Sequence, residues 1–112
     1  PPLVGIWARW PYFHNNSAPT LFDVITPDYK RPKTYIAVEA KDPNKDFDKI
    51  KNGYPEPELI KPEFRNNKKY FFDTTIRGLS NMGHTKMLLD ENGNERFTFQ
   101  EKLELIEFLK TL

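Results

Sequence analysis

The sequence has 112 residues, of which 38% are hydrophobic and 29% are charged. This length fits one domain, and the composition excludes both a disordered tail and a membrane span, which needs roughly 18 consecutive apolar residues. The 17 basic and 16 acidic residues leave a net charge of +1, which argues against binding to a nucleic-acid backbone. The absence of cysteine excludes disulfides, thiolate zinc sites and a cysteine nucleophile.

The N-terminal quarter, residues 1–26, is dense in aromatic and apolar side chains. Their spacing in its first part follows neither a strand nor a helix period, and Pro11 interrupts it, so we expect irregular buried chain. Thr20 and Asp23 have the spacing of a helix N-terminus, and Pro27 should end that helix after about two turns. The chain starts with proline and lacks a signal-peptide pattern, which predicts a fragment of a longer protein folded as a single domain over residues 1–112.

The middle of the chain, residues 27–69, is polar and contains six prolines. Residues 33–39 and 70–75 are rich in β-branched and aromatic side chains, which predicts two strands that pair with each other. Such a pair would enclose a long loop with little structure of its own, which is unusual in a small domain. We therefore expect this loop to be a functional or lining segment.

The C-terminus carries the strongest helix signal. Residues 90–95 form a predicted turn, after which Thr98 and Glu101 make a capping box. The apolar face of the helix comprises Phe99, Leu103, Ile106 and Leu109 or Lys110, widened by Leu105, Phe108 and Leu112. This helix needs a partner surface, and the predicted fold is mainly α with much irregular chain and a small two-stranded β element.

The candidate ligands are few. His14 and His84 have no second histidine or carboxylate at ligand spacing, which argues against a self-contained metal site. His84 follows turn-forming residues, so its imidazole could project from a loop as a ligand or catalytic group, or be an ordinary surface histidine. Met87 could offer a thioether or simply fill the core. Aromatic side chains such as Trp7 and Trp10 could line a cofactor or belong to the core.

Two stretches of the sequence together resemble one protein family. The first is residues 2–21, with WPYFHNNS at 10–17, and the second is GLSNMGH at 78–84 with the ending EFLKTL at 107–112. They are similar to the C-terminal part of the di-haem cytochrome c family, which includes bacterial cytochrome c peroxidases, MauG-type enzymes and rubber oxygenase. Order and spacing agree at both ends of the chain, and only the middle is unmatched.

This resemblance implies a partial cytochrome c-like domain that covers a haem. It points to His84 as the distal ligand of the haem iron, with Met87 as the alternative. Because the chain has no cysteine, haem c would be attached through sequence that is not present here. Arg9 and Arg31 would neutralise haem propionates, or else be solvated or paired with carboxylates. The residues implied to bind the cofactor are Trp7, Arg9, Trp10, Tyr12, His14 and Arg31.

Three departures from the family pattern bear on these roles. Asn16 stands where the family usually has glycine, so a left-handed turn there would rely on the tolerance of asparagine for it. Leu79 replaces the usual asparagine. Asp28 occupies the position of the methionine ligand in the peroxidase branch, which favours His84 as the ligand, as in the rubber-oxygenase-like branch.

The implied function is haem binding and electron transfer, as the distal-ligand half of a periplasmic or secreted c-type cytochrome. Its partners would be the upstream haem-bearing part of the parent and a redox partner protein. The parent would resemble a di-haem peroxidase or oxygenase, whereas this piece alone would not be an enzyme. The alternative is a haem-free binding or interaction module that uses exposed aromatics on the same scaffold to recognise a sugar or a protein.

Overall fold

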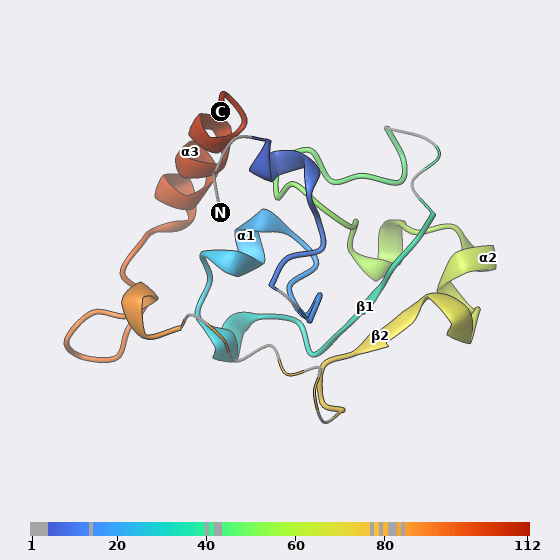
Figure 1. The fold of residues 1–112 in the computed structure, drawn as a ribbon, viewed down its shortest axis with the longest axis horizontal. Helices are drawn as coiled ribbons and strands as arrows, with labels where there is room; N and C mark the ends of the chain where they lie inside the picture. The colour runs from blue at the N-terminus through green and yellow to red at the C-terminus, as the bar shows by residue number, and fades with distance from the viewer. Residues whose placement is uncertain are drawn as a thin grey trace.

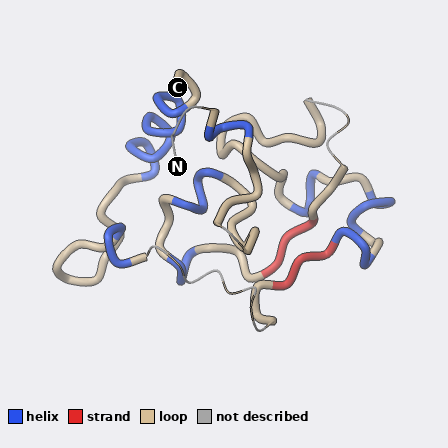
Figure 2. The backbone as a smooth tube through the Cα atoms, in the orientation of Figure 1, coloured by secondary structure: helices blue, strands red, loops and turns tan. Residues whose placement is uncertain are grey.

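The computed structural model describes residues 5–13, 15–39, 41, 44–76, 78, 80, 83 and 85–112. These residues form three short α-helices, one two-stranded sheet and several 3₁₀ turns, joined by irregular chain (Figures 1 and 2). The expected class, mainly α with a small β element, is confirmed. Among the described residues, no helix has the length and apolarity to cross a membrane. The elements are α1 (Leu21–Val24), β1 (Thr34–Ile36), α2 (Pro62–Arg65), β2 (Phe71–Asp73) and α3 (Phe99–Leu109).

Helix α1 begins at the predicted capping box. The Asp23 amide donates to Thr20 Oγ1 at 3.1 Å, and the Thr20 amide donates to Asp23 Oδ2 at 3.2 Å. The helix has only four residues, so the expectation of about two turns was wrong. Pro27 disfavours helical backbone at Thr26, whose hydroxyl donates to Phe22 O at 2.6 Å and closes the turn early.

Strands β1 and β2 pair antiparallel, as the sequence predicts, although each has only three residues. The chain between them is more structured than expected. It contains α2, and Ile60 and Phe64 pack with Ile36 and Val38 into a small second core. The register pairs Thr34 with Asp73, Tyr35 with Phe72 and Ile36 with Phe71.

Helix α3 also begins at its predicted capping box, where the Thr98 amide donates to Glu101 Oε1 at 2.9 Å. Ile106 is completely buried, which confirms the centre of the predicted apolar face. The face is narrower than predicted, because Phe99 and Phe108 are 57% and 60% exposed, whereas Lys102 is buried. Ile106 is the fully buried centre of this face, and the predicted Leu103 and Leu109 are half-buried against the same core.

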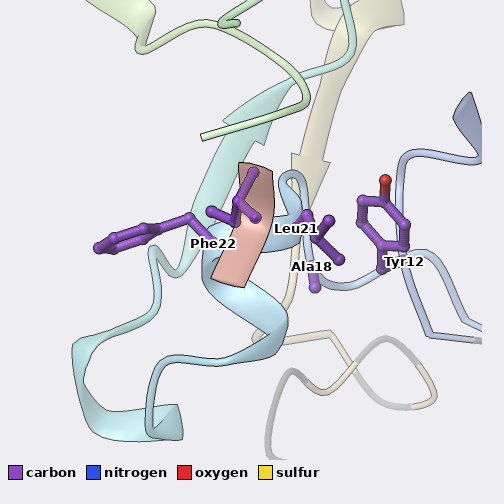
Figure 3. Packing of buried hydrophobic residues seen from close by; sticks show 5 residues of the cluster. Tyr12, Ala18, Leu21 and Phe22 are labelled. Carbon is purple, nitrogen blue, oxygen red and sulfur yellow. The ribbon is translucent and has the colours of Figure 1, made fainter. Parts of the chain in front are cut away.

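The main core joins the two ends of the chain. Figure 3 shows the rings of Tyr12 and Phe22 with Ala18 and Leu21, and Ile106 of α3 completes this cluster. The Gly5 amide also donates to Leu112 O at 3.3 Å. The aromatic N-terminal segment and the one-faced C-terminal helix therefore cover each other.

Candidate functional site

The two motif segments meet through Asn15. Its side-chain amide Nδ2 donates to Ser80 O at 2.9 Å and to Gly78 O at 3.4 Å, although these residues are 65 and 63 positions away in the sequence. Its Oδ1 accepts from the Ser17 amide at 3.2 Å, which fixes the side chain in a local turn. We call this meeting of the described residues within 12–17 and within 78–85 the motif junction.

Arg31 is the second link of the motif junction. Its guanidinium donates from Nη1 to Gly83 O at 2.6 Å and from Nε to Asp23 O and Thr26 O, both at 2.8 Å. The residue is 3% exposed, and burial lowers the pKa of its guanidinium, which Asp28 and Asp23 partly oppose. The bonds described here go to main-chain carbonyls, and the side chain is buried rather than solvated. A contact with a haem propionate stays a prediction.

Thr85 supplies the third link, because its hydroxyl accepts the Asp28 amide at 3.1 Å. Gly83 and Thr85, the two neighbours of His84 in the sequence, are thus both tied to residues 28–31. His84 and His14 themselves lie outside the described residues, so their predicted roles stay predictions.

The backbone next to His14 is unusual. Phe13 and Asn16 have φ values of 65° and 60°, in the left-handed region. The Asn16 amide donates to Phe13 O at 3.1 Å and closes the turn. This confirms the left-handed turn at Asn16, where asparagine replaces glycine. A left-handed conformation costs about 1–2 kcal/mol for an ordinary residue. Phe13 adopts this conformation where the Arg31 guanidinium carbon lies over its ring, 4.8 Å from the ring centroid.

We expect Asn16→Ala to lower the free energy of unfolding by about 1 kcal/mol and Asn16→Gly to leave it unchanged or slightly higher, because alanine tolerates the left-handed region poorly. The measurement is urea unfolding at equilibrium. Asn66→Ala is the matched control, since Asn66 is also exposed but has a φ of −93°. Equal effects at the two positions would contradict the argument.

The other predicted site residues lie in different environments. Trp7 is 41% exposed, whereas Trp10 is half-buried with its ring 4.7 Å from that of Phe47. Arg9 occupies an exposed position, and Met87 is 68% exposed on a 3₁₀ turn. Their roles at a cofactor stay predictions.

Tyr12 belongs to the main core rather than to the surface. Its hydroxyl donates to Ile6 O at 2.9 Å and accepts from Asn52 Nδ2 at 2.8 Å. Burial raises the pKa of Tyr12 to about 12, and the Asn52 hydrogen bond only partly opposes this. The phenol is therefore neutral at physiological pH.

Asn52 and Gly53 are structural residues that the sequence argument missed. Asn52 is completely buried with a φ of 61°, and its Nδ2 also donates to Trp7 O at 2.7 Å. The main-chain carbonyl of Asn52 accepts a hydrogen bond from the Leu21 amide at 2.9 Å, which attaches this turn to α1. The signal that could have found the pair is the Asn-Gly dipeptide, which is typical of tight turns with positive φ.

Comparison with known proteins agrees with the N-terminal motif. Two relatives from Sinorhizobium fredii (strain NBRC 101917 / NGR234), named uncharacterized protein y4iJ and uncharacterized protein y4iM, are 38% and 28% identical to this chain. The alignments cover 99% and 97% of this chain but only 17% and 26% of the relatives, so the chain spans a small part of their length. No solved structure matches it. Residues 1–36 match the family model described as RoxA-like, cytochrome c-like, which supports a cytochrome c-like family for this chain.

Proposed function

We propose that this chain is the distal, haem-covering part of a c-type cytochrome and that it serves haem binding and electron transfer in a longer protein. The observation that carries the proposal is the bridge from Asn15 to the carbonyls of Gly78 and Ser80. It joins the segment matched by the cytochrome c-like family model to the loop that contains His84. Two motifs far apart in sequence are thus parts of one site.

The donor chemistry of the chain fits one side of a haem. An imidazole is a common axial ligand of haem iron, and a haem held by two imidazoles is suited to electron transfer because no coordination position stays open. The chain has no thiol, so covalent attachment of a haem would need cysteines from other sequence. In this arrangement His84 would hold the iron, while Asn15 and Arg31 hold the carbonyls of Ser80 and Gly83, and Thr85 is tied to Asp28.

This function places the protein in the periplasm or outside the cell, where c-type cytochromes act. The parent protein is then peroxidase- or oxygenase-like, and its other parts supply the attached haem and any catalytic site. A redox partner protein delivers or accepts the electrons.

His84→Ala in the full-length protein, produced with haem-maturation machinery, tests the proposal. We expect the six-coordinate low-spin spectrum to be replaced by that of a haem lacking its distal ligand. Met87→Leu tests the alternative ligand and should leave the spectrum unchanged if His84 is the ligand. An unchanged spectrum in His84→Ala would reject the ligand assignment.

A haem-free binding module is the second candidate, favoured by a cleft of about 240 Å³ between α1, β1 and residues 48–57. The rings of Tyr35 and Tyr54, 5.4 Å apart, belong to its lining together with Asp23 and Glu56. Aromatic faces beside carboxylates suit a small polyhydroxylated ligand such as a sugar. Absence of Soret absorbance from the matured full-length protein would favour this candidate over haem binding.

A further inference from the structure

We propose that Arg31 is a positioning residue that fixes the backbone at the residues preceding the two histidines. Its guanidinium contacts the residue that precedes each of them, Phe13 before His14 and Gly83 before His84. This inference rests on the proposed function only where it assumes that His84 binds haem iron.

The first part of the argument is the rigidity of the anchor. Nε of Arg31 is shared between Asp23 O and Thr26 O at 2.8 Å each, and one terminal nitrogen lies 3.4 Å from Val24 O. Carbonyls at the end of α1 and just after it therefore hold one edge of the guanidinium. Because the guanidinium plane is stiff and 97% of the residue's surface is buried, water does not compete for these bonds.

The second part is what the anchored plane holds. Nη1 donates a hydrogen bond to Gly83 O at 2.6 Å, although Gly83 is 52 residues further along the chain. The backbone at Gly83 is therefore bonded directly to the anchored guanidinium. The guanidinium carbon Cζ also lies over the Phe13 ring, 4.8 Å from its centroid. One side chain thus relates the positions of two loops that share no strand or helix.

The third part is the strain that this contact offsets. Phe13 has a φ of 65°, a conformation that bulky residues rarely adopt, and it adopts it next to His14. Backbone strain of this kind persists only where surrounding contacts hold it. The guanidinium over the Phe13 ring is one such contact, so loss of Arg31 should loosen residues 12–17 together with residues 78–85.

A lysine cannot replace this arrangement. Its ammonium keeps the positive charge but is a point donor, unable to bond the carbonyls at the end of α1 and Gly83 O in one plane and lie over the Phe13 ring as well. Arg31→Lys is therefore the informative variant, because it keeps the charge and some capping of α1. Arg31→Met removes both charge and hydrogen bonds, and Lys33→Met is the matched control, an exposed lysine two residues away.

The experiment is amide hydrogen exchange of the full-length protein, with its haem spectrum recorded in parallel. We expect exchange within residues 12–17 and 78–85 to accelerate about tenfold in Arg31→Lys and more in Arg31→Met, as loss of charge-assisted bonds predicts. Exchange in α3 should stay unchanged in Arg31→Lys, and Lys33→Met should resemble the parent protein throughout. If Arg31→Met does not fold, Arg31→Lys decides the question.

The outcomes separate this inference from the proposed function. Unchanged exchange in both loops, or equal acceleration everywhere including α3, would overturn the positioning role. Faster loop exchange together with a partial loss of the low-spin spectrum in Arg31→Lys would support it. If His84→Ala leaves the haem spectrum intact while Arg31→Lys still loosens both loops selectively, the ligand assignment fails and the positioning role stands.

Discussion

Gly53→Ala is expected to lower the free energy of unfolding by about 3 kcal/mol. A Cβ at Gly53 would overlap Pro19 O and lie 2.6 Å from Thr20 Cα, both of which are backbone atoms that cannot rotate away. Hydrogen bonds hold the two segments on either side of this contact, from the Leu21 amide to Asn52 O at 2.9 Å and from the Tyr54 amide to Pro19 O at 3.2 Å. The methyl group would force the segments apart and weaken these bonds.

Urea unfolding at equilibrium measures this effect. Gly83→Ala is the control for a glycine-to-alanine substitution made where the added methyl group meets no close neighbour. A Cβ at Gly83 would have no atom of the described residues within 4 Å, so the stability of that variant should stay within about 0.5 kcal/mol of the parent. If Gly53→Ala is as stable as Gly83→Ala, the turn at residues 48–53 does not pack against α1 as described.

Glu95→Ala should cost a similar amount, about 3 kcal/mol, because it strands a buried charge. The side chain of Lys102 is 4% exposed, is ion-paired with Glu95 and donates to Thr26 Oγ1 at 3.0 Å. Its ammonium also lies 4.1 Å from the centroid of the Phe22 ring. Without the carboxylate, a buried ammonium would keep only a hydroxyl and an aromatic face. Glu91→Ala, which removes an exposed acid from the same turn, should change stability by less than about 0.5 kcal/mol.

Removing the other member of this ion pair should lower the free energy of unfolding much less. Lys102→Met removes the buried charge and keeps an apolar side chain of similar length, while Glu95 keeps its ion pair with Lys30 at 2.9 Å. We expect a loss below about 1 kcal/mol, as for other replacements of a buried ion-pair member that leave no unpaired charge. Equal losses for Glu95→Ala and Lys102→Met would contradict this asymmetry.

The Glu95 contribution should depend on pH in a defined direction. Partial burial raises the pKa of Glu95, but hydrogen bonds and charges from Lys102 and Lys30 outweigh burial and hold the pKa below its usual value. The stabilisation is therefore complete above the pKa of an unfolded glutamate, about 4.3, and is lost as pH falls through the lower pKa of the folded state. The difference in stability between the parent and Glu95→Ala should shrink over that acidic range.

Interactions between near neighbours were predictable from the sequence. The capping boxes at Thr20 and Thr98 each join residues three positions apart, so the sequence pattern alone contains both partners. Asn16 was recognisable because asparagine and glycine share a tolerance for positive φ. The pairing of the two strands followed from composition, since both segments carry β-branched and aromatic residues.

Interactions between distant segments were not predictable in this way. The sequence suggests that Arg31 is solvated, carboxylate-paired or beside a propionate, and nothing near it indicates that it bonds Gly83 O. Likewise, a lysine in the middle of an amphipathic helix predicts exposure, yet Lys102 is buried and donates to Thr26, 76 residues away in the sequence. The partner in each case becomes a neighbour only after the chain has folded.

The sequence by itself determined the class of the fold, the starts of α1 and α3, the left-handed turn at Asn16 and the absence of any thiol for attaching a cofactor. These depend on residue type and on spacings of a few residues. The tertiary structure alone decided that Asn15 and Arg31 tie the two motif segments together and that Gly53 permits the close approach to α1. The physical reason is that a hydrogen bond or a steric contact across 33 to 65 residues depends on the path of the whole chain between them.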